Sequence, residues 1–254
     1  MSPAAPSPSG LCAMLFAAGL GTRFKPWTDS HPKALALVNG KSLLQRNIEY
    51  LQGYGIRDVI VNVHHFPEQI ESAIREHGGW GSRIRISDER MTVLETGGGL
   101  LHAERLFPAG QRFLTCNVDI LTDLDIGKLM AFHEKSGALI SFGVTDRKSS
   151  RKLLLNAAGQ LYGWRNTLTG EERPCEGVKL NEPLQEKAYS CVVVFEYNVF
   201  QLMKSAGFHG KYSLIDVYLT LGGRYPIMGY DHSGDRLVDV GKPESVALAE
   251  SLFP

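Results

Sequence analysis

Residues 11–35, LCAMLFAAGLGTRFKPWTDSHPKAL, decide which fold the sequence predicts. The first eight, residues 11–18, are an apolar run typical of a strand buried on both faces of a sheet. A loop with two glycines and several basic residues follows directly. In open sheets covered by helices, ligands bind at the carboxyl ends of the strands. The loop therefore lies where a ligand site is expected.

Strands and helices alternate outward from this segment. Three further apolar runs predict strands, at residues 59–63 (VIVNV), 113–119 (FLTCNVD) and 138–144 (ALISFGV). Residues 42–52 and 66–76 place apolar side chains at helical spacing, and the second stretch has a proline suited to a first helical turn. This alternation predicts an α/β fold, with a parallel sheet covered by helices on both faces.

The pattern changes after about residue 145. Residues 152–156 and 161–164 predict a hairpin, and residues 189–196 predict another strand. Helices are expected at residues 197–206, 213–221 and 243–252. We therefore predict a single domain at residues 11–254, with a small antiparallel insertion at about residues 145–196. The Pro/Ser/Ala-rich residues 1–10 are expected to form a flexible tail.

Composition excludes few functions but disfavours several. The 254 residues include 27 Lys+Arg and 27 Asp+Glu, so the formal net charge is zero and a nucleic-acid partner is not expected. No apolar run reaches the roughly 18 residues that a membrane-spanning helix needs. The four cysteines are far apart and form no CxxC pair, which disfavours a zinc site and a disulfide framework. Reduced thiols and the absence of a basic start to the tail favour a cytoplasmic protein.

The loop after the first strand has the chemistry of a polyphosphate site. Gly19 and Gly21 would let backbone N–H groups approach phosphate oxygens, and Arg23, Lys25 and Lys33 supply positive charge.

Two common phosphate motifs do not fit this loop. The dinucleotide motif GxGxxG/A requires a small residue where Phe24 stands. A Walker loop could end at Gly40-Lys41-Ser42, but its first glycine would have to replace Leu35.

The segment instead resembles the GxGxRxxPxT…PK signature of the sugar-1-phosphate nucleotidyltransferases. The matching residues, at the family's spacing, are Gly19, Gly21, Arg23, Pro26, Thr28, Pro32 and Lys33. The likeness extends from about residue 11 to residue 253. It implies a Rossmann-like, mostly parallel sheet flanked by helices, with a small antiparallel sugar-binding insertion.

The resemblance also implies a reaction and its binding groups. In this family an oxygen of a sugar 1-phosphate attacks the α-phosphorus of a nucleoside triphosphate, and pyrophosphate leaves. Arg23 and Lys33 would be the catalytic cations. The residues implied to bind the nucleotide are Ala18, Gly19, Gly21, Thr22, Arg23, Thr96 and Gly97. Glu89 and Arg90 are further candidates.

Two aspartates are implied to bind Mg²⁺. Asp119 ends an apolar strand, and Asp239 lies in the string DVGKPE before a helix; both contexts match the family's metal-binding aspartates. Carboxylate oxygens completed by phosphates are the usual ligands of Mg²⁺. For each aspartate taken alone, a helix cap or a turn is an equally good interpretation.

Sugar contacts are implied at Asn117, Asn166 and Ser190. The sequence departs from the family at Val118, where relatives usually have glycine, and at Cys191, which replaces glycine in an F-S-G string. Trp164, in the string GWRN, fits the sugar pocket or the core equally well.

The string LETGGGL at residues 94–100 and the later DVGKPE look most similar to the N-acetylmuramate-1-phosphate uridylyltransferases of bacterial wall recycling. A helix is expected just after this glycine-rich string. UTP with N-acetylmuramate 1-phosphate is the leading substrate pair, in a monomer or homodimer. Guanylyl transfer to mannose or heptose 1-phosphate is the main alternative, and CTP with phosphocholine is more distant. A catalytically idle nucleotide-sugar-binding regulator is a rival of another class.

Overall fold

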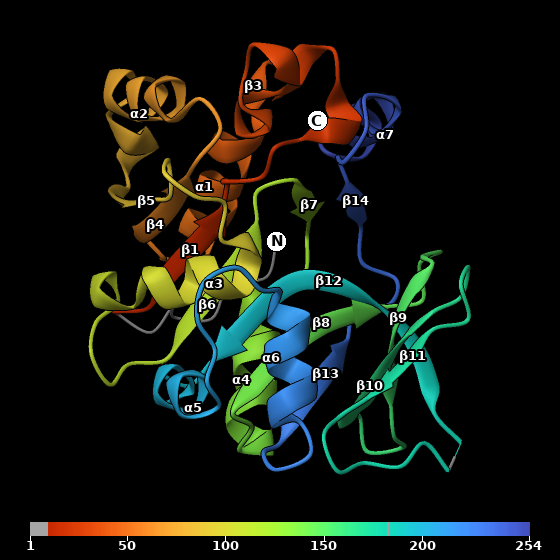
Figure 1. The fold of residues 1–254 in the computed structure, drawn as a ribbon. Coiled ribbons are helices and arrows are strands. Elements are labelled where there is room, and N and C mark those ends of the chain that lie inside the picture. Colours follow the sequence, from red (N-terminus) through yellow and green to blue (C-terminus); the bar gives the residue numbers. More distant parts are fainter. Residues whose placement is uncertain (1–9, 182) are drawn as a thin grey trace.

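A computed structural model describes residues 10–181 and 183–254, so the predicted tail lies almost entirely outside the described residues. A ten-stranded sheet runs through the molecule in the order β11-β10-β9-β12-β6-β1-β4-β5, with β8 beside β12 and β13 beside β8 (Figure 1). Two short two-stranded sheets, β14-β7 and β2-β3, accompany it.

The strands are β1 (Cys12–Phe16), β2 (Leu37–Val38), β3 (Lys41–Ser42), β4 (Asp58–Val63), β5 (Arg83–Asp88), β6 (Phe113–Asn117), β7 (Ile120–Thr122), β8 (Ile140–Thr145), β9 (Arg151–Leu155), β10 (Leu161–Asn166), β11 (Glu172–Pro174), β12 (Gln185–Phe195), β13 (Ile227–Asp231) and β14 (Leu237–Asp239). The α-helices are α1 (Leu43–Gly53), α2 (Pro67–Glu76), α3 (Glu95–His102), α4 (Ile126–Ser136), α5 (Val199–Ser205), α6 (Leu214–Leu221) and α7 (Glu244–Leu252). Short 3-10 helices are η1 (Thr22–Phe24), η2 (Trp27–Asp29), η3 (Lys33–Leu35), η4 (Gly78–Gly81) and η5 (Glu104–Leu106).

The parallel strands β6, β1, β4 and β5 form the part of the sheet that the first sequence segment predicts. Side chains of β1 alternate between two cores. Ala13 and Leu15 belong to the core that contains residues of α1, whereas Met14 and Phe16 belong to the core that contains residues of α6. Burial on both faces explains why this strand is apolar at every position. The predicted α/β class and parallel sheet are confirmed.

The antiparallel strands extend the same sheet. The long strand β12 pairs with β6 through residues 192–195 and with β9 through residues 185–187. The predicted hairpin is present as β9 and β10, and β11 pairs with β10 beyond it. In Figure 1 strands β9, β10 and β11 lie at the end of the molecule away from β4 and β5, and β12 extends from them to the centre of the sheet. The sequence prediction missed β5, β11, β13 and α4.

Helix caps explain several helix boundaries. The Ser42 side chain accepts a hydrogen bond from the backbone N–H of Gln45 at the start of α1. Ser213 and Asp216 form a capping box at the start of α6. Pro67 is the first residue of α2, as its ring geometry favours. None of the described helices is long and apolar enough to cross a membrane.

The glycine-rich string differs from the prediction, because it lies inside helix α3 and does not precede a helix. Close packing accounts for this difference. A Cβ added at Gly98 would lie 2.1 Å from the carbonyl oxygen of Gly210, and one at Gly97 would lie 2.5 Å from the Tyr212 ring. Tertiary contact therefore overrides the low helix propensity of glycine.

Candidate active site

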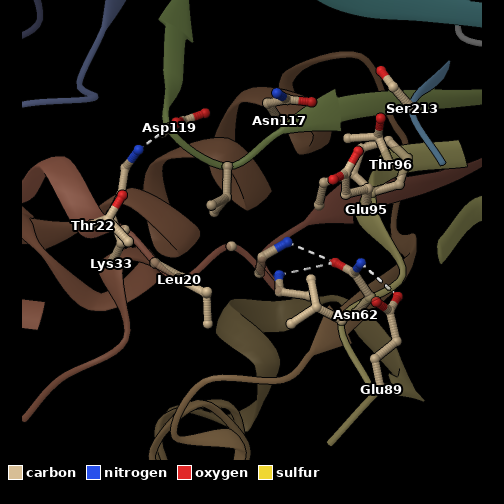
Figure 2. Close-up of a pocket in the computed structure, with 18 of the residues that line it drawn as sticks. Leu20, Thr22, Lys33, Asn62, Glu89, Glu95, Thr96, Asn117, Asp119 and Ser213 are labelled. Atoms are coloured by element: carbon tan, nitrogen blue, oxygen red, sulfur yellow. Dashed lines mark hydrogen bonds and ion pairs between the residues drawn. The ribbon is translucent and has the colours of Figure 1, made fainter. Parts of the chain in front are cut away.

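A pocket of about 480 Å³ opens at the carboxyl ends of β1, β4 and β6 (Figure 2). The glycine loop, the start of α3 and the turn after β6 form its walls. Predicted residues that line it are Ala18, Gly19, Gly21, Thr22, Lys33, Thr96, Asn117 and Asp119. Glu89 also lines it. Of the other two candidates beside this loop, Arg90 pairs with acidic residues and Lys25 pairs with Asp29 at 2.9 Å. Neither Arg90 nor Lys25 lines the pocket.

The glycine loop offers free donors to the pocket. The backbone N–H groups of Gly19, Leu20 and Gly21 donate no hydrogen bond to residues 10–181 or 183–254. Gly21 adopts φ 60°, and its carbonyl oxygen accepts a hydrogen bond of 2.9 Å from the Thr28 hydroxyl. The backbone N–H of Ala18, in contrast, already donates to the Asn62 side chain at 3.3 Å. The backbone N–H groups that the loop can offer to a ligand therefore begin at Gly19, after Ala18.

The pocket floor contains a buried pair that sequence reasoning only partly found. Asn62 donates a hydrogen bond of 2.8 Å to Glu89 Oε1, and its Oδ1 accepts one of 2.6 Å from the Ala17 N–H (Figure 2). Glu89 Oε2 has no hydrogen-bond partner among the described residues. Burial raises the pKa of Glu89, and the Asn62 hydrogen bond opposes that shift. Asn62 was detectable as a polar residue inside the apolar run VIVNV.

Both catalytic candidates and both aspartates meet at one place. Lys33 Nζ forms an ion pair with Asp119, which follows β6. Strand β14 pairs with β7 so that Asp239 lies opposite Ile120, and the Val240 N–H donates to the Asp119 carbonyl oxygen at 2.8 Å. These contacts bring the Asp119 and Asp239 backbones together.

Arg23 completes this group. A Cβ built on Gly241 would lie 2.6 Å from Asp239 Oδ1 and 2.7 Å from Arg23 Nη2. The glycine therefore lets the Arg23 side chain and the Asp239 carboxylate approach each other. Arg23 and Asp239, which are far apart in the chain, thus both lie against Gly241, near the glycine loop.

A second pocket, of about 520 Å³, adjoins the first. Asn117 and Asp119 line both pockets. Arg23 of η1 lines the second pocket as well. Other lining residues come from the loop after β8 and from β9, β10, β12 and β14, and they include Arg147, Trp164, Tyr189, Cys191 and Asp239. A chemical group bound in one pocket can therefore meet a group bound in the other at Asp119.

Three of the predicted contacts lie outside the pocket walls. The Ser190 side chain is buried and its Oγ lies 2.7 Å from His232 Nε2, so it faces the interior. Asn166 Oδ1 accepts a hydrogen bond of 3.0 Å from the Leu168 N–H in the turn after β10. Gly97 lies against Tyr212 and donates its N–H to the Tyr212 carbonyl oxygen at 3.0 Å. Each of these three residues therefore contributes hydrogen bonds or packing contacts within the fold.

Cys191 lies where strand β12 shifts register, between Tyr189 and Val193. Its φ of 59° is in the left-handed region, where glycine is favoured and a side chain is strained. The Cys191 side chain lines the second pocket, which a glycine would leave wider. Burial raises the pKa of its thiol, so the group is a neutral wall and not a thiolate nucleophile.

The two aspartates suit a hard cation. Asp239 Oδ1 is buried and has no hydrogen-bond partner among the described residues. Within those residues no group of three or more His, Cys, Asp or Glu side chains could enclose a metal ion by itself. Mg²⁺ prefers oxygen ligands, and two carboxylates together with phosphate oxygens and water would complete its octahedral coordination.

Comparison with known proteins agrees with this geometry. An N-acetylmuramate alpha-1-phosphate uridylyltransferase of Caulobacter vibrioides is 45% identical over 109 residues, which are 42% of this chain and 45% of that protein. The catalytic subunit beta of a mannose-1-phosphate guanylyltransferase of Dictyostelium discoideum is 34% identical over 126 residues, 49% of this chain and 35% of that protein. The chain thus spans half or less of the length of these curated relatives.

Solved structures share the fold. A Bacillus anthracis protein, provisionally described as a glucose-1-phosphate thymidylyltransferase and solved with sucrose, has a TM-score of 0.79 and 14% identity, with 96% of this chain and 95% of that chain covered. The sequence model of the family described as nucleotidyl transferase matches residues 12–153. Because that match includes more than half of the 254 residues of this chain, the chain belongs to the nucleotidyl transferase family.

Proposed function

We propose that this protein transfers a nucleotidyl group from a nucleoside triphosphate to a sugar 1-phosphate, releasing pyrophosphate. The observation that supports this most directly is the meeting of two pockets at Asp119, beside Lys33, Arg23 and Asp239. One pocket suits the triphosphate and the other suits the sugar phosphate. The shared wall is where their two phosphorus centres would meet.

The proposed step is one displacement at the α-phosphorus. An oxygen of the sugar 1-phosphate forms a bond to that phosphorus while the bond to the bridging oxygen of the β-phosphate breaks, and pyrophosphate takes the electron pair. The N–H groups of Gly19, Leu20 and Gly21 would hold the triphosphate. Arg23 and Lys33 would balance the negative charge that builds on the transferring phosphate. Positioning and charge supply the catalysis, with no covalent intermediate.

Asp119 and Asp239 would hold Mg²⁺ in this account. When bound, the ion would neutralise phosphate charge and fix the relative positions of the phosphates. The buried, unpartnered Oδ1 of Asp239 supports this assignment. Chelation of divalent metal should then stop turnover, and added Mg²⁺ should restore it.

We propose UTP and N-acetylmuramate 1-phosphate as the substrates. The similarity to the Caulobacter relative supports this pair. The similarity to the Dictyostelium guanylyltransferase subunit supports GTP with mannose 1-phosphate as the second candidate. The presence of both aspartates and both cations disfavours an idle regulator. A nucleoside triphosphate substrate, Mg²⁺ and the free cysteines suit a cytoplasmic enzyme.

A pyrophosphate-release screen tests the proposal. Four nucleoside triphosphates are each combined with N-acetylmuramate, N-acetylglucosamine, glucose and mannose 1-phosphates, with and without Mg²⁺. We expect the fastest release with UTP and N-acetylmuramate 1-phosphate. Release with GTP and mannose 1-phosphate, without any UDP-sugar, would reject the proposed substrates. No release from any combination would reject the proposed reaction.

A further inference from the structure

The second pocket has more arginine side chains than the transferring phosphate requires. Arg147 and Arg151 line it together with Arg23. Within residues 10–181 and 183–254, none of these three forms an ion pair with a carboxylate, whereas Arg165 and Arg173 on the neighbouring strands pair with Glu172 and Asp216. Arginines that line a pocket without carboxylate partners indicate that an anionic ligand binds there.

Arg147 is held firmly in the pocket wall. Its Nη2 donates a hydrogen bond of 3.0 Å to the Tyr189 carbonyl oxygen, and its own carbonyl oxygen accepts one of 3.1 Å from Lys152 Nζ. Its Nε is buried and has no hydrogen-bond partner among the described residues. A buried guanidinium N–H normally finds an acceptor in the functional state, so the free Nε–H points to a ligand oxygen.

Arg147 comes from a different element than the residues proposed to hold the transferring phosphate. Arg23 lies beside Asp239, and Lys33 pairs with Asp119, at the junction of the pockets. Arg147 instead follows β8, is hydrogen-bonded to Tyr189 of β12, and forms no hydrogen bond or ion pair with Asp119 or Asp239 among the described residues. An anion recognised there would belong to the sugar itself and not to its 1-phosphate.

We infer that Arg147 is a specificity-determining residue that recognises a carboxylate on the sugar, so that the enzyme selects acidic amino-sugar 1-phosphates over neutral ones. A planar guanidinium matches a carboxylate through two parallel N–H donors. Arg151, which is exposed and also lines the pocket, adds further positive charge there. This inference rests on the proposed function, because it names the sugar that the second pocket accepts.

Two substrates that differ by one group provide the test. N-acetylmuramate 1-phosphate is N-acetylglucosamine 1-phosphate with a lactyl ether, which adds a carboxylate. With UTP and Mg²⁺, kcat/KM is measured for both sugars in the wild-type protein and in Arg147→Gln, Arg147→Lys and Lys148→Gln. Lys148 is an exposed neighbour outside both pockets, so Lys148→Gln is the matched control.

We expect Arg147→Gln to lower kcat/KM for the acidic sugar by roughly 10- to 100-fold, as loss of a charge-assisted hydrogen bond does, and to change the neutral sugar less than about threefold. Arg147→Lys should give an intermediate loss, and Lys148→Gln should match the wild type. Activity on the neutral sugar shows that each variant is folded.

Three results would overturn the inference. Equal losses on both sugars would mean that Arg147 binds the phosphate or only supports the wall. An unchanged preference in Arg147→Gln would mean that another group reads the carboxylate. A wild-type preference for the neutral sugar would reject an acidic substrate while the nucleotidyltransferase proposal stands. Absence of turnover with every sugar would reject the proposed function itself.

Discussion

At the residue scale, the two glycines of the loop, Gly19 and Gly21, have different roles. Gly21 has φ 60°, and an added Cβ would lie 2.8 Å from Thr28 Cγ2 and 3.1 Å from Lys33 Cβ. Gly19 has an ordinary φ, and nothing lies within 4 Å of a Cβ added there, although the residue lines the first pocket. Gly21 is thus needed by the fold, whereas Gly19 leaves open space at the wall of the first pocket.

Alanine substitution distinguishes the role of Gly21 in the fold from the role of Gly19 in the pocket. Gly21→Ala should lower the free energy of unfolding by about 1–3 kcal/mol, from left-handed strain and overpacking. Gly19→Ala should change stability by less than about 0.5 kcal/mol, but should raise KM for the nucleoside triphosphate roughly tenfold by obstructing it. Urea unfolding and steady-state kinetics measure both effects. A destabilised Gly19→Ala with normal KM would contradict this assignment.

The aspartates are tested by removing charge without changing shape. Asp119→Asn and Asp239→Asn should each lower kcat at least about 100-fold, since the transferring phosphate loses its metal or its orientation. Asp239→Asn should melt close to the wild type, because Asp239 Oδ1 has no hydrogen-bond partner among the described residues. Asp29→Asn is the matched control, as Asp29 is an exposed partner of Lys25 outside both pockets. Wild-type turnover in Asp119→Asn would contradict the metal assignment.

Motif residues were predictable because their spacing fixes backbone position. Lys33 and Asp119 were both proposed from sequence, and they form an ion pair. Ser190 and Asn166 were proposed from position alone, yet neither lines the first or the second pocket. Which way a side chain points on a bulged strand depends on register, which a sequence does not state. Arg147 was missed for another reason, because only folding brings the loop after β8 to the pocket.

At the element scale, the irregular part of β12 shapes the second pocket. Tyr189 and Cys191 face the pocket, while Ser190 between them bonds to His232 in the interior. Asp235 Oδ2 lies 3.3 Å from His232 Nδ1. Ser190 and His232 are buried, whereas Asp235 is exposed, so the buried Ser190–His232 hydrogen bond lies in the part of the strand where its register shifts. It also makes the element sensitive to acid.

Protonation of His232 should weaken the fold at low pH. Burial holds the pKa of His232 below its ordinary value, and Asp235 only partly opposes this shift. Below pH 6.5 His232 is therefore protonated in the unfolded chain but still neutral in the folded chain. The contribution of His232 to the free energy of unfolding is complete above pH 6.5 and decreases as the pH falls below it. Each pH unit in this window costs up to about 1.4 kcal/mol.

Chemical unfolding at pH 7.5 and 5.5 measures the effect. The wild type should lose more stability between these pH values than His232→Gln, whose amide can still accept from Ser190. His133, whose pKa burial also lowers, is present in both proteins and cancels in the comparison. Identical losses in both proteins would show that His232 does not govern this acid sensitivity.

The glycine-rich helix α3 shows where element prediction fails. Three consecutive glycines predict a loop by propensity, but close contacts with residues 210–213 stabilise a helix there. In contrast, β1, β4 and α1 were predictable, since burial and caps leave their signal in the local sequence. Long-range contact overrides local signal only where backbones touch.

At the scale of the whole molecule, one sheet carries two pockets on neighbouring strands. The parallel strands hold the first pocket at their carboxyl ends, and the antiparallel strands that continue the sheet wall the second. A neutral overall charge thus conceals a local excess of arginine and lysine around Asp119 and Asp239. This arrangement suits a direct transfer between two bound substrates.

Direct transfer predicts the stereochemistry at phosphorus. A single in-line displacement inverts the configuration of the α-phosphorus, whereas a covalent enzyme intermediate would give two inversions and net retention. With one isomer of UTP that has sulfur on its α-phosphate, the nucleotide-sugar product should have the inverted configuration. Retention, read by ³¹P NMR after conversion to a reference compound, would require a nucleophile on the protein.

The most direct test of the central claim follows both products of one reaction. The protein is mixed with UTP, N-acetylmuramate 1-phosphate and Mg²⁺, and ³¹P NMR records all phosphorus species over time. We predict that a UDP-sugar and pyrophosphate appear together in a one-to-one ratio, and that neither forms when the sugar phosphate is omitted. Release of phosphate or pyrophosphate from UTP without formation of a nucleotide sugar would contradict the account.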